Sequence, residues 1–583
     1  MEWVLTNPNR FLHERAEMER LAKDAGWLTF AWRLANSELQ VDVDLTVHGR
    51  IYAGRLTYPA VFPNSPPYIC PRDPSERWSN HQYGAGGALC LQWRADNWQP
   101  QVTGAEMVRS AYELLHTEQQ PQVPGVVPSD HRVTQGQALR GTTNRLIATA
   151  GLLEMLRALP THGRFRITAC NVTHRSVSVR LVAKVGEEGE EVAVPDVPSG
   201  LASFFPLFSW SSAGSIFRSA TLVNGPDPST VDELIKQITD DGLEAASLYS
   251  KEGLLLSGLV LFSSGDKLKA FAIETGESTA LSKHQVIVEP TDQIRLNAES
   301  VALKEIKVGI VGLGSIGSKV AASLARSGVN RFILVDDDLL LPGNMIRHEL
   351  TWASIGVHKA RAAHDWLRLI AADVDVSTHS HRLAGQESAI SEAALLKQLA
   401  DCDLLVDASA NPEVFLRLAA VATTYKRALV WGEVFAGGYG GLVARARPDL
   451  DPSPLNVRAG FYAHLETLPP APFRQAANYD GSDETPFVAY DSDVAHIASA
   501  LTRLAIDTAL KRTPSQFPYP VYLIGLRREW VFTQPFDTRP VAVQGGGWEM
   551  DGQPVSDDQR IEVIKQLINL HAAQTDAHGI TAS

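Results

Sequence analysis

Three glycines in the second half of the chain have the spacing of a turn that approaches phosphate. Gly312, Gly314 and Gly317 form the pattern G-x-G-x-x-G between an apolar, strand-like segment and a helical one. The first glycine permits a tight turn, the second lets the backbone approach a phosphate, and the third lets the helix pack on the strand. The next strand-like segment ends at Asp336, where a carboxylate can bind ribose hydroxyls. These residues predict a nucleotide site, and an NAD-dependent dehydrogenase explains them equally well.

The residues that follow distinguish between two nucleotide chemistries. After Asp336 and Asp338 the chain places an amide, Asn344, and two cations, Arg347 and Lys359. Hydride transfer has no use for two fixed cations beside the nucleotide. Attack of a carboxylate on the α-phosphate of ATP does, because negative charge develops on the phosphate oxygens and pyrophosphate must leave. The pattern therefore favours ATP, and we expect both cations to face solvent and nucleotide rather than the core.

These residues together resemble the adenylation domain shared by ubiquitin-activating (E1) enzymes and their bacterial ThiF and MoeB relatives. The family's motifs D-x-D, N-x-x-R and G-x-x-K stand here in order at matching offsets. The resemblance implies that Asp336 holds the ribose, that Arg347 and Lys359 contact the phosphates, and that Asn344 helps to orient them. Because relatives of this fold are usually homodimers, it also implies a homodimer.

The next motif of that family, D-x-x-D-N, is incomplete here. Asp407 and Asn411 match it, but Ala410 replaces the second acid, which in the family helps to bind Mg²⁺. Two outcomes are open: either Asp407 or Asp338 binds Mg²⁺ instead, or the site is weakened. We favour the first.

Of the four cysteines, only Cys90 lies in a sequence suited to covalent chemistry. No C-x-x-C pair is present, which argues against a zinc site or a disulfide framework. Cys90 lies on a segment flanked by glycines and polar residues, so we expect it to be exposed, and an exposed thiolate can carry an acyl group. We expect structural roles for Cys70 and Cys170, and burial for Cys402 at the start of an apolar strand. No cysteine follows Cys402, so a conventional C-terminal E1 cysteine is absent from this sequence.

The region around Cys90 resembles the active site of ubiquitin-conjugating (E2) domains. A proline-rich stretch precedes it, and the resemblance rests on a histidine, a G-x-x-C-L motif and a W-x-P motif: His81, Gly87, Cys90, Leu91, Trp98 and Pro100. The resemblance implies an α+β domain that carries a thioester on Cys90. The family has H-P-N, whose asparagine stabilises the oxyanion, where this chain has H-Q-Y. A structural role for His81, holding the loop by hydrogen bonds, is therefore at least as well supported as a catalytic one.

Residues 1–125 contain the elements that must position Cys90. A helical pattern over residues 9–25 precedes alternating, strand-like segments, and a second helix is predicted over residues 104–119. Between them, prolines concentrate in residues 58–74. We expect that stretch to be irregular, because proline cannot extend a β-ladder.

The rest of the chain divides into two regions. Residues 126–295 begin with a polar linker and carry no chemical motif. A helix is predicted there at residues 231–238, and strands are predicted in three segments: residues 174–185, 253–264 and 267–275. Residues 296–583 alternate strands and helices, which predicts a parallel sheet covered on both faces. The expected fold is a multidomain α/β and α+β chain, with an E2-like domain, a mixed middle region and a Rossmann-like ThiF/E1 domain.

Composition narrows the classes of partner. With 583 residues and a formal net charge of -13, the chain is large enough for several domains and lacks the basic surface that nucleic-acid binding needs. No stretch reaches the roughly 20 apolar residues of a membrane span. The N-terminal segment lacks the apolar core of a signal peptide. The four widely spaced cysteines form no disulfide framework and predict a cytoplasmic location, where thiols stay reduced.

An E2-like region ahead of an E1-like region resembles the bacterial E1–E2 fusion proteins of antiphage defence operons. The resemblance implies ATP-dependent activation of a C-terminus, transfer to Cys90, and conjugation to a target protein. The activated partner is then a ubiquitin-like protein or the C-terminus of a nucleotidyltransferase. Two alternatives stay open: an adenylyltransferase for sulfur transfer, and a degenerate scaffold that binds a ubiquitin-like partner without turnover.

Overall fold

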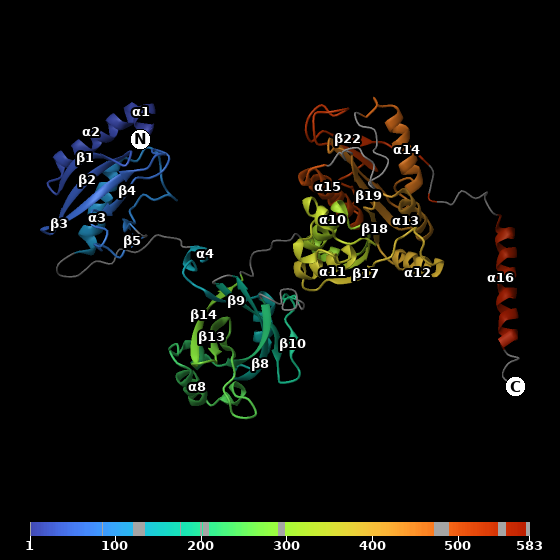
Figure 1. The fold of residues 1–583 in the computed structure, drawn as a ribbon, viewed down its shortest axis with the longest axis horizontal. Helices are drawn as coiled ribbons and strands as arrows, with labels where there is room; N and C mark the ends of the chain where they lie inside the picture. The colour runs from blue at the N-terminus through green and yellow to red at the C-terminus, as the bar shows by residue number, and fades with distance from the viewer. Residues whose placement is uncertain are drawn as a thin grey trace. The chain divides into compact units, whose positions relative to one another are not determined.

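In the computed structural model the chain divides into two compact units, Met1–Arg140 and Gly141–Ser583 (Figure 1). The residues that the structure describes are 2–83, 86–119, 134–174, 177–198, 201, 209–289, 298–435, 437–471, 489–545, 548 and 556–578. The polar linker predicted after residue 120 and both predicted region boundaries lie outside these ranges. None of the helices within them is long and apolar enough to cross a membrane.

The first unit contains an antiparallel four-stranded sheet in the order β1-β2-β3-β4, with α2 and α3 packed on it. On β2, Val41, Val43 and Leu45 are fully buried, so this face of the sheet forms the core. The predicted helices and strands are confirmed. The elements are α1 (Glu2–Thr6), α2 (Pro8–Asp24), β1 (Leu28–Ala35), β2 (Glu38–Val47), β3 (Arg50–Tyr58), β4 (Tyr68–Pro71), β5 (Gln82–Tyr83), β6 (Ala88–Leu89), α3 (Gly104–Glu118) and α4 (Gln135–Ala138).

A buried carboxylate joins the helices of this unit to its sheet. Glu14 on α2 accepts hydrogen bonds from the Tyr58 hydroxyl (2.8 Å) and from the Gly104 N–H (2.7 Å), and it pairs with Arg10 at 2.8 Å. Gly104 is the first residue of α3. The start of the helix that follows Cys90 is thus anchored to the core.

The proline-rich stretch contains a strand, so the prediction that it is irregular was wrong for residues 68–71. β4 pairs antiparallel with β3, with Pro71 opposite Gly54. The strand lies at the edge of the sheet, where one side needs no partner, and proline is tolerated there because its missing N–H breaks no ladder.

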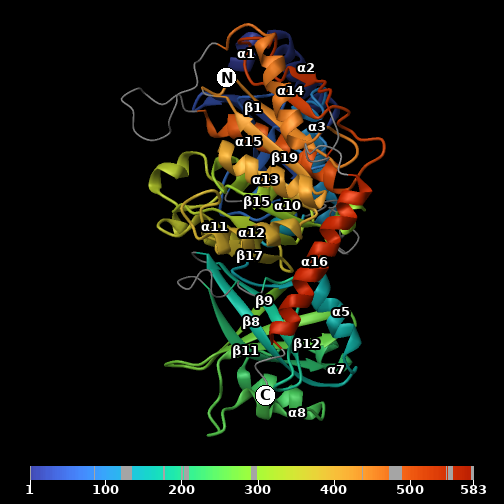
Figure 2. The same cartoon turned by 90° about the vertical axis from the view of Figure 1, so that its right-hand side faces the viewer.

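Residues 144–288 form a sheet that closes on itself. Its order is β10-β9-β7-β14-β13-β12-β11-β8, and β8 also pairs with β9, so seven strands form a ring (Figures 1 and 2). The predicted helix and strands are confirmed within the described residues, except that residues 253–257 precede the strand and that residues 175–176 of one predicted strand lie outside the described ranges. The elements are β7 (Asn144–Ala148), α5 (Ala150–Ala158), β8 (Gly163–His174), β9 (Val177–Gly186), β10 (Val192–Ala193), β11 (Ser209–Arg218), α7 (Ala220–Asn224), α8 (Val231–Asp240), η1 (Ala245–Leu248), β12 (Gly258–Ser264), β13 (Lys267–Glu274) and β14 (Ala280–Val288).

The C-terminal region contains an eight-stranded sheet in the order β17-β16-β15-β18-β19-β20-β21-β22. Neighbouring strands from β17 to β19 are parallel, and those from β19 to β22 are antiparallel. The prediction of a parallel sheet is therefore right for five strands and wrong for three. The connection from β19 to β20 spans only residues 435–439, which is too short for the crossover that a parallel pair requires.

The bounds of these elements follow the chain order. They are α9 (Glu299–Leu303), β15 (Lys307–Val311), α10 (Ser315–Arg326), β16 (Arg331–Val335), η2 (Pro342–Ile346), η3 (Trp352–Ser354), α11 (Lys359–Ile370), β17 (Asp375–His379), α12 (Ala389–Ala400), β18 (Leu404–Asp407), α13 (Pro412–Tyr425), β19 (Ala428–Val434), β20 (Gly440–Ala446), α14 (Pro454–Glu466), α15 (Asp491–Ala509), β21 (Val521–Gly525), β22 (Thr538–Val541) and α16 (Asp557–His578).

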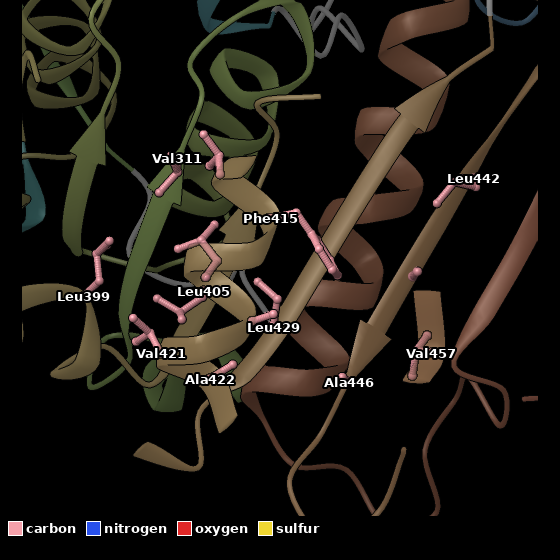
Figure 3. Close-up of a cluster of buried hydrophobic side chains, with 14 of the residues drawn as sticks. Val311, Leu399, Leu405, Phe415, Val421, Ala422, Leu429, Leu442, Ala446 and Val457 are labelled. Atoms are coloured by element: carbon pink, nitrogen blue, oxygen red, sulfur yellow. The ribbon is translucent and has the colours of Figure 1, made fainter. Parts of the chain in front are cut away.

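Helices cover this sheet on both faces, as predicted. Val311, Leu405 and Leu429 pack on one face with side chains of α12, α13 and α14 (Figure 3). Ile310 and Val406 face the other way, toward α10 and α15. Because β15, β16 and β18 are parallel, their carboxyl ends lie at one edge of the sheet, which is where ligands bind in folds of this kind.

Candidate functional site

The glycine-rich turn joins β15 to α10 and leaves the start of the helix uncapped. Gly312 has φ +86°, and a Cβ there would lie 2.6 Å from the backbone of Ser409. A Cβ on Gly317 would lie 1.9 Å from the carbonyl oxygen of Gly312. Gly314 is the N-cap of α10, and a Cβ there would meet nothing within 4 Å. The first N–H groups of α10 therefore have no side-chain cap, and they can bind a phosphate.

Asp336, at the end of β16, holds this turn in place. Its Oδ2 accepts from the Leu313 N–H at 2.6 Å, and its Oδ1 accepts from the Asp338 N–H at 2.9 Å. Burial raises the pKa of the Asp336 carboxyl, and the hydrogen bond from Leu313 and the charge of Lys359 oppose that rise. Each carboxylate oxygen can accept a second hydrogen bond, so a ribose hydroxyl is compatible with both contacts.

His348 supports the same turn from the other side, and the sequence analysis did not single it out. The ring is buried, its Nδ1 accepts from the Leu350 N–H at 3.1 Å, and its Nε2 lies 2.7 Å from the Leu313 carbonyl oxygen. Since Nδ1 accepts, the proton belongs on Nε2, which donates to Leu313. Burial lowers the pKa of His348, which favours this neutral ring. Its position directly after Arg347 was the available signal.

Asn344 shapes the turn that presents Arg347. The Asn344 Oδ1 accepts from the Leu341 N–H at 2.8 Å, and the Asn344 carbonyl accepts from the Arg347 N–H at 3.1 Å. Arg347 is half-buried, and its Nη1 donates to the Ala489 carbonyl at 3.4 Å. Asn344 therefore lies next to Arg347, and its hydrogen bonds support the turn that holds Arg347.

Lys359 is buried, so the prediction that both cations face solvent was wrong for this residue. It is the first residue of α11, and its side chain is 9% exposed. The ammonium reaches Asp338, whose Oδ2 lies 2.7 Å from Nζ, and the Lys359 N–H donates to the Asp338 carbonyl at 2.9 Å. The Asp338 side chain is 67% exposed. An apolar stem packed in the protein thus carries a charge toward the surface.

Asp407 ends β18 and lies beside a small cavity. Its Oδ1 accepts from the N–H and the hydroxyl of Ser409, at 3.0 Å and 2.6 Å. Burial raises the pKa of the Asp407 carboxyl, with these hydrogen bonds opposing. The cavity has a volume of about 60 Å³, and Ala410, Glu433 and Arg458 also line it. Glu433 and Arg458 were not predicted from the sequence, although an acid inside the apolar run of β19 is a visible signal.

These residues fit a divalent cation only with help from the nucleotide. Within the described ranges, no three or more His, Cys, Asp or Glu side chains gather where they could hold a metal. Magnesium commonly takes one or two protein carboxylates together with water and phosphate oxygens. Asp407 keeps one oxygen without a Ser409 hydrogen bond and lines a cavity with room for a cation, whereas Asp338 is exposed, pairs with Lys359 and does not line that cavity. Asp407 is therefore the better of the two predicted ligands.

Cys90 lies in the first unit, between β6 and α3, and is half-buried rather than fully exposed as expected. Its N–H donates to the His81 carbonyl at 2.6 Å. Burial raises the pKa of the Cys90 thiol, while the charge of Arg94 and a hydrogen bond from it oppose that rise. Arg94 pairs with Asp96 at 3.1 Å, and Asn97 accepts from the Arg94 N–H at 2.6 Å. A compact loop thus holds a cation beside the thiol.

The contacts of His81 favour the loop-holding role. Its carbonyl accepts from Cys90, its N–H donates to the Ser79 hydroxyl at 2.8 Å, and its Nε2 lies 3.8 Å from the Glu118 carboxylate. The His81 backbone is thus fastened to Ser79 and Cys90, and its ring lies next to Glu118 at the end of α3. These contacts connect Cys90 to that helix through the loop.

The other cysteines differ from Cys90 in burial or surroundings. Cys402 is buried, as predicted, and burial raises its pKa to about 12; Cys170 is buried as well. Cys70 is half-buried on β4, and burial raises its pKa as well. Cys90 differs from the buried Cys402, which has Lys307 and Arg427 nearby, because it is half-buried and its thiol has a hydrogen bond with the cation Arg94.

Comparison with known proteins identifies the domain that contains the glycine turn. Residues 292–453 match the model of the ThiF family. The chain therefore carries a ThiF-type α/β domain, as the sequence predicted.

Individual relatives match over limited stretches. The ATP-dependent ubiquitin transferase-like protein Cap2 of Enterobacter hormaechei is 35% identical over 130 residues, which is 22% of this chain and 21% of that protein. Uncharacterized protein y4oA of Sinorhizobium fredii is 34% identical over 25% of this chain and 26% of its own length. Ubiquitin-like modifier-activating enzyme 5 of Drosophila melanogaster is 29% identical over 27% of this chain and 38% of its own length. The matches to y4oA and Cap2 thus span about a quarter or less of those proteins.

Solved structures with a similar arrangement include Escherichia coli MccB in complex with AMPCPP and MccA. The two chains are 15% identical with a TM-score of 0.31, over 42% of this chain and 66% of MccB.

Proposed function

We propose that the ThiF-type domain uses ATP to adenylate the C-terminal carboxylate of a protein partner. The observation that carries this proposal is the arrangement at one sheet edge of an uncapped helix start, Asp336 behind the glycine turn, and the cations Arg347 and Lys359 beside it. The uncapped helix start can bind phosphate, Asp336 can bind a ribose hydroxyl, and the two cations can stabilise a leaving pyrophosphate. The similarity to the ThiF family supports the same reaction class.

The proposed reaction proceeds by substitution at phosphorus. An oxygen of the partner's C-terminal carboxylate attacks the α-phosphorus of ATP, the bond from that phosphorus to the bridging oxygen breaks, and pyrophosphate leaves. The product is an acyl-adenylate. Arg347 stabilises the negative charge that develops on the phosphate oxygens, and Lys359 does so after exchanging Asp338 for phosphate.

A magnesium ion fits this site beside Asp407. When bound, it would neutralise phosphate charge and thereby ease the departure of pyrophosphate. Asp336 and His348 keep their structural task, which is to fix the backbone of Leu313 so that the phosphate-facing N–H groups of α10 stay in place.

We further propose that Cys90 accepts the acyl group as a thioester. The Cys90 thiolate attacks the acyl carbon and AMP leaves with the former carboxylate oxygen. An amine or hydroxyl of the target then displaces the thiolate, which recovers a proton from solvent. Support comes from the position of Cys90 in the compact loop with Arg94, and from the resemblance of this segment to E2 domains.

We also propose the class of partner proteins. A ubiquitin-like protein or the C-terminus of a nucleotidyltransferase would supply the carboxylate, a second protein would receive it, and two copies of the chain would act together. The similarity to Cap2 and to the ubiquitin-like modifier-activating enzymes supports this class of partner. A role in antiphage defence is the biological setting that we propose.

Partner-dependent exchange of labelled pyrophosphate into ATP tests the adenylation step. The partners to try are ubiquitin-like and nucleotidyltransferase proteins encoded beside this gene, each with and without its last residues. We expect exchange with the intact tail only. Arg347→Ala should abolish it, because losing one such contact costs about 3 kcal/mol in the transition state. The matched control is Arg361→Ala, an exposed arginine on α11, which should exchange normally.

The same assay separates the alternatives. A partner that binds tightly but supports no exchange would establish the scaffold instead of the enzyme. If exchange occurs, nonreducing gels with ATP, magnesium and the partner should show a reductant-sensitive adduct on wild type that is lost in Cys90→Ala. Exchange with no adduct, followed by sulfide incorporation into the partner's tail, would favour sulfur transfer. Cys70→Ser should retain the adduct and serves as the control.

A further inference from the structure

The cavity beside Asp407 opens where the carboxyl ends of β18 and β19 lie next to each other. Asp407 is paired in register with Trp431, so Glu433 lies two residues farther along β19, on the same face as Trp431. Both carboxylates line the cavity, and so does Ala410 from the turn that follows β18. Glu433 thus borders the space next to the position at which an acid is missing.

The charges around the cavity do not balance. Asp407 is buried and uses one oxygen for Ser409. The Glu433 side chain makes no hydrogen bond or ion pair with the described residues, although the charge of Arg458 acts on its carboxyl. Arg458 supplies one positive charge, but its guanidinium lies over the ring of Phe415, 4.4 Å from the centroid. Two carboxylates against one cation leave a net negative charge. Desolvated carboxylates are costly unless a cation or donors compensate them.

The dimensions also suit a small cation. The cavity volume of about 60 Å³ exceeds the roughly 10–15 Å³ that a single water requires, so a cation and some of its waters have room. Small hard cations prefer carboxylate oxygens, and magnesium keeps several waters when it binds. An anionic ligand would meet two like charges in the same space.

We propose that Glu433 and Asp407 together bind the divalent cation that accompanies ATP, and that Glu433 takes the place of the acid that Ala410 replaces. The inference rests on the proposed use of ATP, and it adds a ligand from β19, a different strand from the one that carries Asp407. Arg458 then balances one of the two carboxylates and leaves the other to the metal. The phosphates supply the remaining oxygens.

The backbone at Ala410 offers a way to test this replacement. Ala410 has φ +53°, in the left-handed region that alanine rarely adopts and that aspartate and asparagine enter more readily. Ala410→Asp is therefore compatible with the local backbone. Because residue 410 lines the same cavity, the new carboxylate would be placed to compensate for the loss of Glu433.

The experiment measures how much a metal strengthens the binding of AMPCPP to the full chain, by calorimetry in the presence of either excess Mg²⁺ or EDTA. In wild type, Mg²⁺ should strengthen binding. In Glu433→Gln we expect this enhancement to fall about tenfold, with unchanged affinity in EDTA. Glu413→Gln, an exposed acid in the first turn of α13, is the matched control and should behave as wild type. Ala410→Asp combined with Glu433→Gln should regain the enhancement.

Each outcome decides the question. Retention of the full enhancement in Glu433→Gln overturns the assignment, and so does nucleotide binding in wild type that is indifferent to Mg²⁺. Loss in Glu433→Gln that Ala410→Asp restores supports it. Loss of AMPCPP affinity in EDTA as well would show that Glu433 acts on the nucleotide site without a metal. Failure of pyrophosphate exchange with every partner would contradict the proposed function, but it would leave this binding result standing.

Discussion

The same added methyl group should have different effects at two glycines of one turn. In Gly317→Ala the new Cβ would lie 1.9 Å from the Gly312 carbonyl oxygen and 3.2 Å from the Cβ of Ala408. Ordinary contacts lie at roughly 3.5 Å, so the turn and the helix would have to separate by roughly 1.5 Å. Gly312 cannot move away freely, because the backbone of Ser409 lies only 2.6 Å from the position that a Cβ on Gly312 would take.

The cost of Gly317→Ala follows from this geometry. Overpacking that shifts backbone costs about 1–3 kcal/mol, which lowers the melting temperature of a domain of this size by roughly 2–10 °C. The same displacement moves the N–H groups at the start of α10 away from a phosphate. Loss of about 1.4 kcal/mol of binding free energy corresponds to a tenfold higher dissociation constant. We expect at least that loss for AMPCPP.

Gly314→Ala is the matched control. Its Cβ would meet nothing within 4 Å, and its φ of -72° suits alanine. We expect a free energy of unfolding within about 0.5 kcal/mol of wild type, but weaker AMPCPP binding, because the methyl group would occupy the space of the phosphate. Thermal melting and calorimetry on the full chain measure both quantities. Wild-type AMPCPP affinity in Gly314→Ala would refute phosphate binding at this turn, and wild-type melting in Gly317→Ala would refute the packing argument.

Three further variants test other parts of the structure. Because burial raises the pKa of Cys90 and Arg94 opposes the rise, iodoacetamide labelling should still accelerate above pH 9. Arg94→Gln should slow labelling at pH 8, because loss of the cation and its hydrogen bond lowers the fraction of thiolate; equal rates would exclude an influence of Arg94. His348→Phe removes two buried hydrogen bonds and should destabilise the ThiF-type domain by about 1–3 kcal/mol in thermal melting. Arg445 pairs with the buried Asp507 at 2.8 Å, and Arg512 lies 3.8 Å from the same carboxylate. Arg445→Leu removes the nearer cation and should cost about 3–5 kcal/mol, with partial recovery when Asp507 also becomes leucine; an additive double variant would contradict the pairing.

The nucleotide turn could be predicted from sequence because each of its residues acts through a local constraint. Gly312 needs a left-handed backbone and Gly317 needs an absent side chain, and both needs depend on the few residues of one turn. Asp336 follows its strand by one residue, so its position at the sheet edge follows from the strand itself. The spacing of the motif was therefore sufficient to predict the geometry of the turn.

Burial and cross-strand proximity could not be predicted in the same way. From the sequence, Lys359 was expected at the surface. Only the packing of α11 shows that its aliphatic stem is buried and that its ammonium pairs with Asp338. Glu433 belongs to no motif near Ala410, and it reaches that position only because β19 lies next to β18. The strand of residues 68–71 was missed since proline was judged without knowing that the strand lies at an edge.

The closed sheet of residues 144–288 has a consequence for how the chain folds during synthesis. β7 pairs in parallel with both β9 and β14, and the Ala148–Val288 pair joins residues about 140 positions apart. At typical rates of 5–20 residues per second, β14 emerges roughly 7–28 s after β7. The first unit, whose strands pair with their immediate successors, has no such wait. The domain that contains Cys90 can therefore fold while the middle sheet is still incomplete. Until β14 is synthesised, the side of β7 that pairs with it stays open and accessible to chaperones.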